Sequence, residues 1–381
     1  MTRLRVLVAT VVALSGLVAS AGAPAQGPPS ALPAVQQALD EVVAAGAPGA
    51  MALVRDGNRT IRLSSGFGNL APRTPMRAGD RFRIGGLTKT FTATVVLQLV
   101  GEGKVALSDT VERWVPGAIS NGEAISVRQL LNHTSGIFDY INDPRVLTPY
   151  VEDLPGTLTL VFDPGEGVRI AAEHGPLFAP GSALAYSNTN YLLLAMIVEE
   201  ATGNSFGSEL RERIFEPLGL RHTAYPTSSR INGSYVHGYF LLGEPPLYDI
   251  TPLSPTVIGA AGGILSSAED LARFYRALLQ GQLLGPGLLS AMQTIDPVAT
   301  GGIPDSGFPG GGWGLGLLSE NFPCAREAWG HDSEIPGYVT AAWNSKDGNR
   351  QVVAVVNRTL DPDEPATRAL RGVLAAAYCR A

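Results

Sequence analysis

Charged residues are scarce in this chain. Asp, Glu, Lys and Arg together make up 16% of its 381 residues, whereas hydrophobic residues make up 45%. So large an apolar share favours a folded core over disorder, and a chain of this length is expected to fold as two lobes. The net charge is −6 and no basic cluster occurs, so nucleic acid is not expected as a partner.

Histidine is rare as well, and its positions do not suggest a metal site. The five histidines show no ligand spacing, and no CxxC pair occurs, so no metal site is predicted. A phosphate-binding glycine loop follows a strand and precedes a helix. The sequence predicts neither element beside the glycine run at 310–312, so this run is not interpreted as such a loop. Neither a metal nor an organic cofactor is implied.

Apolar runs long enough to cross a membrane are absent. The most apolar run, Val6–Val18, is shorter than the roughly 20 residues that a membrane-spanning helix needs. Arg3 and Arg5 precede it and small residues follow it at 19–25, a pattern typical of a secretory signal peptide. We therefore predict a signal peptide over residues 1–25 and a secreted, extracytoplasmic protein without a membrane span. Removing this segment would take the net charge from −6 to −8.

The chain has only two cysteines, Cys324 and Cys379. They lie far apart in a protein that is expected to be exported. In an oxidising compartment, one structural disulfide is favoured over two free thiols.

Sequence periodicity predicts both helices and strands. The segment 87–100 is apolar nearly all round, which indicates a helix buried on every side. Other helices are expected at 31–45, 126–131, 190–201, 206–214, 267–279 and 366–378, and strands at 50–55, 60–64, 313–318, 328–330, 338–344 and 351–357.

The order of these elements predicts an α/β (α+β) fold. Helices at both ends with strands beside them favour an antiparallel sheet covered by the terminal helices, with an all-helical lobe inserted in the middle. We expect the sheet lobe to comprise residues 26–105 and 255–381, and the helical lobe to comprise residues 106–254.

Several short motifs carry residues with chemical potential. The first, over residues 82–89, reads Phe-Arg-Ile-Gly-Gly-Leu-Thr-Lys and places Gly86 and Lys89 three residues apart. This spacing puts both positions on one face of a helix. The second, over residues 130–136, contains His133, which we interpret as a packed, hydrogen-bonded residue. The third is Tyr186-Ser187-Asn188, and the fourth, over residues 330–338, reads Gly-His-Asp-Ser-Glu-Ile-Pro-Gly-Tyr.

Taken in this order, the motifs resemble those of the penicillin-recognising serine hydrolases, the family of the serine DD-peptidases and class C β-lactamases. The resemblance covers nearly all of residues 26–381 and is closest to the soluble exported D-alanyl-D-alanine carboxypeptidases. It implies a β-lactamase/transpeptidase-like fold and a monomer. A peptide or small-molecule ligand would bind in the cleft between the lobes.

The resemblance also implies roles for individual residues. Lys89 and Tyr186 would transfer protons. The substrate would be bound by Asn188, His331, Ser333 and Glu334. In the family, the first motif reads Ser-x-x-Lys, and the serine attacks the substrate carbonyl. Here Gly86 stands at that serine position, so the acyl-enzyme route is expected to be disabled.

Some catalytic groups would survive this change. The resemblance implies an oxyanion hole made of the backbone N–H groups of Gly86 and Glu334, which does not need the missing side chain. Lys89 and Tyr186 could still polarise a water molecule at the vacated position, and hydrolysis without a covalent intermediate would be slow.

The fourth motif departs from the family as well. Ser333 replaces a glycine that lets the substrate backbone approach, and Asp332 and Glu334 add two carboxylates that would repel a carboxylate-bearing ligand. The arginine that the carboxypeptidases use for that carboxylate corresponds to Leu318.

Three interpretations of Gly86 are open. In the first, Gly86 is an engineered change that traps substrate. In the second, the chain is a non-catalytic envelope protein that binds a peptide or cell-wall fragment. Alternatively, the chain is a recruited enzyme that uses Lys89 and Tyr186, with Asp332 or Glu334, for acid–base chemistry. Ser187 and Ser333 are weaker candidates for a replacement nucleophile.

Overall fold

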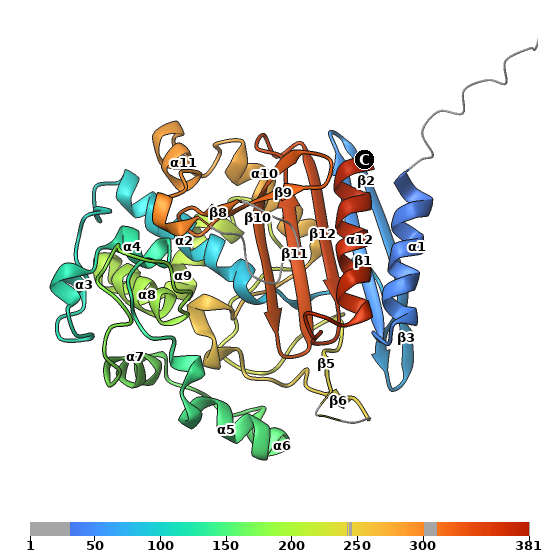
Figure 1. The fold of residues 1–381 in the computed structure, drawn as a ribbon, viewed down its shortest axis with the longest axis horizontal. Helices are drawn as coiled ribbons and strands as arrows, with labels where there is room; N and C mark the ends of the chain where they lie inside the picture. The colour runs from blue at the N-terminus through green and yellow to red at the C-terminus, as the bar shows by residue number, and fades with distance from the viewer. Residues whose placement is uncertain (1–30, 242, 244–245, 301–310, 381) are drawn as a thin grey trace, which may run out of the picture.

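Eight antiparallel strands form the central sheet of this computed structural model (Figure 1). The structure describes residues 31–241, 243, 246–300 and 311–380, so the predicted signal peptide at 1–25 lies outside the described residues. In spatial order the strands are β3 (Arg73–Pro75), β2 (Arg59–Leu70), β1 (Gly49–Asp56), β12 (Arg350–Val356), β11 (Tyr338–Asn344), β10 (Arg326–Ile335), β9 (Leu318–Phe322) and β8 (Gly312–Trp313).

One face of the sheet is covered by two helices from opposite ends of the chain, α1 (Ala31–Ala44) and α12 (Pro365–Arg380) (Figure 1). Successive side chains of a strand point to opposite faces of the sheet, and the central strands are buried on both faces. On β1, Ala50 and Ala52 pack towards these two helices, while Met51 and Leu53 join the larger core on the opposite face. The predicted antiparallel sheet flanked by terminal helices is confirmed.

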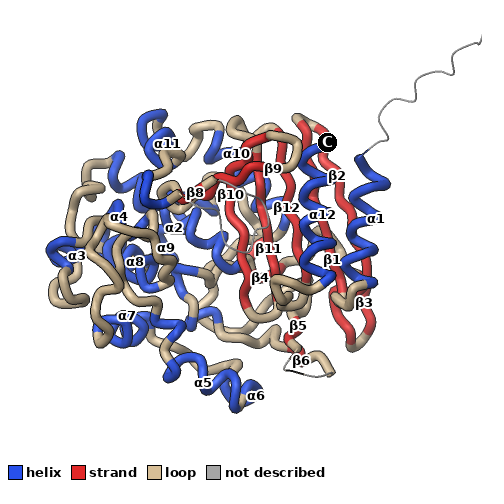
Figure 2. Tube along the Cα trace, in the orientation of Figure 1, coloured by secondary structure: helices blue, strands red, loops and turns tan. Residues whose placement is uncertain are grey.

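The opposite face of the sheet packs against α10 (Ala268–Leu279) and against the turn that leads into α2 (Thr88–Gly101), a helix that shares the core on this face. The remaining helices are α3 (Val111–Trp114), α4 (Val127–Leu131), α5 (Pro144–Glu152), α6 (Leu154–Thr157), α7 (Pro164–Ala172), α8 (Thr189–Thr202), α9 (Phe206–Leu210) and α11 (Pro286–Met292). Figure 2 shows α3 to α9 gathered beside the sheet. They form the helical region that the sequence predicts as an insertion.

Helix α2 links the two regions. Nearly all of its side chains are buried, in agreement with the predicted all-round burial. Its Phe91 belongs to a core cluster that also contains Leu193 of α8 and Phe274 of α10. Because this core runs through both predicted lobes, the position of α2 is fixed from the sheet side and from the helical side at once. The lobe boundaries at 105 and 254 remain a prediction.

Two short strand pairs complete the fold. The first pairs β4 (Phe82–Arg83) with β7 (Leu265–Ser266), and the second pairs β5 (Tyr239–Phe240) with β6 (Tyr248–Asp249). The β4–β7 pair directly precedes the turn that leads into α2, so it helps to position that helix.

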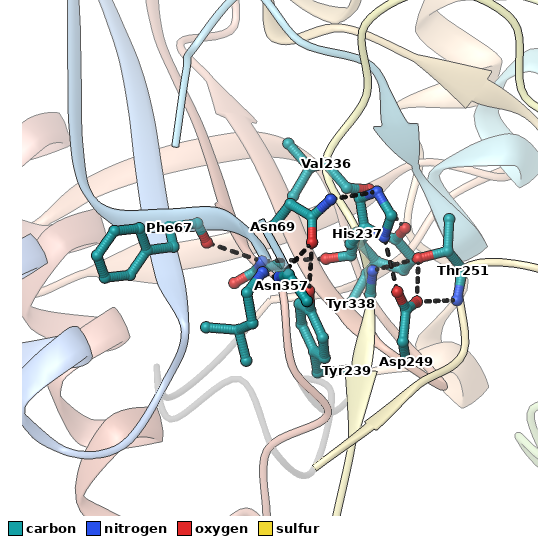
Figure 3. A network of polar contacts seen from close by, with 12 residues as sticks. Phe67, Asn69, Val236, His237, Tyr239, Asp249, Thr251, Tyr338 and Asn357 are labelled. Carbon is teal, nitrogen blue, oxygen red and sulfur yellow. Dashed lines mark hydrogen bonds and ion pairs between the residues drawn. The ribbon is translucent and has the colours of Figure 1, made fainter. Parts of the chain in front are cut away.

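A polar network holds the segment around β5 and β6 against the sheet (Figure 3). The His237 ring lies between Asp249, whose Oδ2 is 2.7 Å from Nδ1, and Asn69, whose Nδ2 is 3.0 Å from Nε2. Asn357, directly after β12, donates through Nδ2 to the backbone oxygens of Phe67 and His237. These contacts tie the chain to two strands of the sheet as it leaves the helical region.

The predicted strand at 313–318 is wrong. β8 ends at Trp313, residues 314–317 form a turn, and β9 begins at Leu318. Gly316 has a φ of +72°, which breaks an extended strand and which glycine adopts at little cost. The helix predicted at 206–214 has two parts. The α-helix α9 ends at Leu210, and the chain continues as a π-helical turn over Arg211–Phe215.

Cys324 and Cys379 form a disulfide, in agreement with the sequence prediction. The bond joins the turn between β9 and β10 to the last turn of α12. It therefore fastens the terminal helix to the edge region of the sheet, beside Tyr378 and Phe322, whose rings pack at 4.4 Å.

Removing this disulfide should destabilise the fold. Cys324→Ala with Cys379→Ala should lower the free energy of unfolding by about 4 kcal/mol, because the bond closes a loop of roughly 55 residues in the unfolded chain. Guanidinium titration of the oxidised protein and the double variant measures the difference. Reduced wild-type protein is the control and should unfold at the midpoint of the variant. A loss below about 1 kcal/mol would contradict the loop-closure explanation.

Candidate active site

The first motif forms a tight turn at the start of α2. Residues Gly85–Leu87 make one 3₁₀ turn before the α-helix begins at Thr88. Gly85 has a φ of +53°, and a side chain there would collide with the Ser333 hydroxyl and with Ile335. Glycine is therefore required at 85 both by the backbone and by the close approach of strand β10. Gly86 is buried at the same junction.

Lys89 lies one turn further along α2 and is fully buried. Its Nζ donates hydrogen bonds to Asn188 Oδ1 and to the backbone oxygen of Ala261, both at 2.8 Å. Burial lowers the pKa of Lys89 to about 7, against an opposing contribution from the Asp139 carboxylate. The amine is therefore poised to gain or lose a proton near neutral pH.

The third motif supplies the partners of this lysine. Asn188 stands immediately before α8 and donates through Nδ2 to Asp139 Oδ2 at 2.8 Å. Tyr186 donates through its hydroxyl to the same Asn188 Oδ1 at 3.2 Å, and its ring centre lies 4.7 Å from Lys89 Nζ. A chain of contacts thus runs from Tyr186 and Lys89 through Asn188 to Asp139.

Tyr186 is the member of this group that reaches the surface. It is 43% exposed, while its hydroxyl lies against Asn188. Desolvation, followed by the carboxylates of Asp139 and Asp332, raises the pKa of Tyr186 above its usual value. The phenol is consequently a donor rather than a base at neutral pH.

The fourth motif lies on β10, where side chains alternate between the two faces of the sheet. His331 and Ser333 face the start of α2. The Ser333 Oγ accepts a hydrogen bond from the Gly86 backbone N–H at 2.6 Å. The His331 ring is buried, and its Nδ1 contacts the backbone oxygen of Asp332. Burial lowers the pKa of His331 to about 3, with a further contribution from Lys89, so the ring is neutral at pH 7.

Asp332 and Glu334 alternate with these residues on the strand. Asp332 is partly buried and Glu334 is exposed. Among the described residues, β9 pairs with β10 as far as Gly330, and β11 pairs with β10 from Trp329 to Ile335. Leu318, which the sequence analysis places at the position of the carboxypeptidases' arginine, pairs with Gly330 and is buried in the core beneath α1 and α12.

The structure brings the predicted site residues together. Lys89 and Tyr186 both donate a hydrogen bond to Asn188 Oδ1, and the Gly86 N–H donates one to Ser333. A Cβ built at Gly86 would lie 3.1 Å from His331 Cε1. Glu334 follows on the same strand. The placement of the residues agrees with the sequence analysis, and the roles assigned to them remain predictions.

Sequence reasoning missed three contributors. Asp139 follows the second motif and is the buried carboxylate of the Lys89 network. Trp313 packs its ring against those of His133, Tyr186 and His331, at 4.6, 5.6 and 5.8 Å between ring centres. Ala261 contributes only a backbone oxygen. No motif marks these positions in a single sequence.

His133 is a buried packing residue, as interpreted from the sequence. Its Nδ1 accepts hydrogen bonds from the Ser187 backbone N–H and from Asn190 Nδ2, both at 3.2 Å. Its ring stacks on Tyr186 with 4.6 Å between centres. Burial holds its pKa well below the usual value. His133 therefore supports Tyr186 from behind.

Metal ligation and membrane insertion are not indicated by the described part of the chain. Within it, no group of three or more His, Cys, Asp and Glu side chains could hold a metal ion. No described helix combines the length and apolar character needed to cross a membrane.

Comparison with known proteins places this arrangement in a family. The family model described as "Beta-lactamase" matches residues 35–377, which include both regions of the fold and all four motifs.

The chain belongs to the beta-lactamase family.

Relatives within the beta-lactamase family differ in their named activities. A crystal structure of a D-stereospecific amidohydrolase from a Streptomyces species is 38% identical, with a TM-score of 0.82 and coverage of 92% of this chain and 99% of that one. The D-amino acid amidase of Ochrobactrum anthropi SV3, complexed with L-phenylalanine amide, is 28% identical, with a TM-score of 0.79 and coverage of 91% and 98%.

A curated relative of the same family is longer than this chain. Penicillin-binding protein 4* of Bacillus subtilis is 28% identical over 319 residues, which are 79% of this chain and 66% of that protein. The chain thus spans just under two thirds of the length of this relative.

The pKa of Lys89 predicts a dependence of stability on pH. The folded-state value of about 7 lies below the value of about 10.4 in an unfolded chain, so unfolding takes up a proton between these limits. The free energy of unfolding should therefore rise from pH 7 to pH 9, by at most about 1.4 kcal/mol per pH unit from this group. Below pH 7 the lysine is charged in both states and this contribution to the slope disappears.

Denaturant titrations at pH 6, 7, 8 and 9 measure this slope. Lys89→Met is the matched control, because it retains the length of the side chain and removes the titrating amine. Its slope between pH 7 and 9 should be smaller than that of the wild type, whatever its absolute stability. Equal slopes would show that the buried lysine keeps its proton across this range.

Proposed function

We propose that this member of the beta-lactamase family binds a ligand containing a D-amino acid and does not form an acyl-enzyme with it. The observation that carries the proposal is the glycine at position 86, three residues before Lys89 at the head of the buried helix. A glycine has no side-chain atom that could attack a carbonyl. The covalent route of the family's serine enzymes is therefore closed at this position.

The residues around Gly86 support binding. Tyr186 offers an exposed ring and Asn188 a fixed amide, held by Lys89 on one side and by Asp139 on the other. These groups would recognise a peptide or amide without reacting with it.

The charges on β10 favour an uncharged ligand end. Asp332 and Glu334 lie on the strand that would contact the ligand, and the buried Leu318 cannot provide a cation for a carboxylate. A D-amino acid amide avoids this repulsion. The structural relatives named D-stereospecific amidohydrolase and D-amino acid amidase support the same ligand class. A D-Ala-D-Ala peptide of the carboxypeptidase type is the alternative ligand.

A second candidate function is slow hydrolysis without a covalent intermediate. The observation that favours it is the pKa of Lys89, which burial brings to about 7 and thus near the optimum for a general base. The lysine would take a proton from a water molecule as that water attacks the ligand carbonyl.

Secretion of the mature protein as a monomer is part of the proposal. The disulfide between Cys324 and Cys379 is of the kind that persists in oxidising compartments, and this supports the predicted export.

Binding without acylation can be tested on the wild-type protein. Calorimetric titration should show saturable binding of D-phenylalanine amide and at least about tenfold weaker binding of D-Ala-D-Ala, a difference of about 1.4 kcal/mol. Intact-mass measurement after incubation with p-nitrophenyl acetate, under conditions that do not modify unfolded protein, should show no stoichiometric adduct.

Asp332→Asn with Glu334→Gln is the matched variant for the charge argument. It removes both carboxylates with little change of shape, so it should strengthen D-Ala-D-Ala binding and leave D-phenylalanine amide binding nearly unchanged. A stoichiometric covalent adduct on the wild type would overturn the proposed function. Steady release of phenylalanine from its amide without an adduct would support the second candidate.

A further inference from the structure

The hydroxyl of Ser333 accepts a hydrogen bond from the backbone N–H of Gly86, with 2.6 Å between Oγ and the nitrogen. We propose that Gly86 and Ser333 are a matched pair. The Ser333 side chain lies in the space that a serine side chain at position 86 would need, and its hydroxyl accepts the hydrogen bond of the backbone N–H that such a serine would need to have free. This inference rests on the proposed function, in which the site does not acylate. It explains why two positions on different elements both depart from the family pattern.

The space next to Gly86 is already taken. A Cβ added to this residue would lie 3.1 Å from His331 Cε1, 3.3 Å from Ser333 Oγ and 3.4 Å from Ser333 Cβ. The first two distances are tighter than ordinary van der Waals contact, and a serine would add an oxygen beyond that Cβ. A side chain at position 86 would therefore require His331 and Ser333 to shift by a few tenths of an ångström, whereas glycine requires no shift.

The amide at position 86 is also engaged. In an acylating enzyme of this type, that N–H must be available to the oxyanion of the tetrahedral intermediate. Here the N–H is satisfied by Ser333, so an incoming carbonyl oxygen would have to displace the hydroxyl first. Loss of one such donor lowers the rate about 10²–10³-fold in a serine protease. The hydrogen bond from the Gly86 N–H to Ser333 therefore opposes acylation independently of the missing nucleophile.

Ser333 is placed as an acceptor and not as an activated nucleophile. Its Oγ receives the Gly86 hydrogen bond, whereas the Lys89 amine directs its hydrogen bonds to Asn188 and Ala261. His331, two residues away on the strand, contacts backbone oxygen through Nδ1. The contacts of Ser333 thus serve to fill the site.

The pair predicts an asymmetry between single and double variants. Gly86→Ser restores the nucleophile but leaves the crowded space and the occupied amide. Ser333→Gly frees the amide and removes the two Ser333 contacts, leaves the contact with His331 Cε1, and supplies no nucleophile. Only Gly86→Ser with Ser333→Gly provides the hydroxyl together with the free N–H and the space that Ser333 filled.

Acylation by p-nitrophenyl acetate measures this directly. The hydroxyl introduced by Gly86→Ser would attack the ester carbonyl, pass its proton to Lys89, and release p-nitrophenolate as the ester C–O bond breaks. Wild type and Ser333→Gly should show no burst of p-nitrophenol and no mass increase of one acetyl group. The double variant should acylate at least about tenfold faster than Gly86→Ser, since it regains the oxyanion donor.

The stability of a second set of variants keeps the test independent of catalysis. Gly86→Ala adds only the Cβ and should lower the melting temperature. The double variant Gly86→Ala with Ser333→Gly should lower it by less than the sum of the decreases caused by the two single variants. Additive effects would overturn the proposed contact between the two positions.

The outcomes separate this inference from the proposed function. If Gly86→Ser acylates as fast as the double variant, or if both fold and neither acylates, the matched pair is overturned and the proposed function stands. If the wild type acylates, the proposed function fails. Peptide mapping of that adduct to Ser333 would overturn the matched pair as well, because the strand serine would then be a nucleophile.

Discussion

The burial of α2 is the constraint on which the site depends. This helix is buried nearly all round and packs against α8 and α9, while the turn that leads into it contacts β10 and β11 of the sheet. Its first turn must therefore enter the core with its polar groups satisfied inside the protein. Lys89 meets this requirement through Asn188 and Ala261, and Gly86 through Ser333. The polar contacts of the site are therefore also the contacts that allow the start of α2 to be buried in the core.

These contacts order the site independently of any nucleophile at position 86. A buried ammonium that lost its partners would destabilise the fold by several kcal/mol. Lys89, Asn188 and Asp139 thus have a structural use that is independent of any reaction. Their presence in this chain is compatible with a site that only binds, as the function proposed above requires.

Much of this architecture is accessible from the sequence, because periodicity and motif order act locally. The buried helix, the terminal helices and the disulfide follow from residue patterns along the chain. The convergence of Lys89, Tyr186 and Asn188 follows from the resemblance to a known family. The turn after Trp313 could not be foreseen, since it depends on the backbone of Gly316, and the apolar residues around it read as one continuous strand.

The contacts between distant residues could not be predicted in the same way. Asp139 and Trp313 carry no motif, and they reach the site only because the helical region and the sheet share one core. The resemblance predicts from the sequence that Gly86 and Ser333 both depart from the family pattern. Their direct hydrogen bond, however, is a property of the three-dimensional fold, since 247 positions separate them in the chain.

The pairing of α1 with α12 has a consequence for handling the protein. Both helices cover the sheet face opposite α2, and in Figure 1 α1 begins and α12 ends at the same end of the strands. The described ends of the chain therefore lie near each other, on the face opposite α2. A linker between them would suit circular permutation, and a surface attachment at either helix would leave Tyr186 facing the solution.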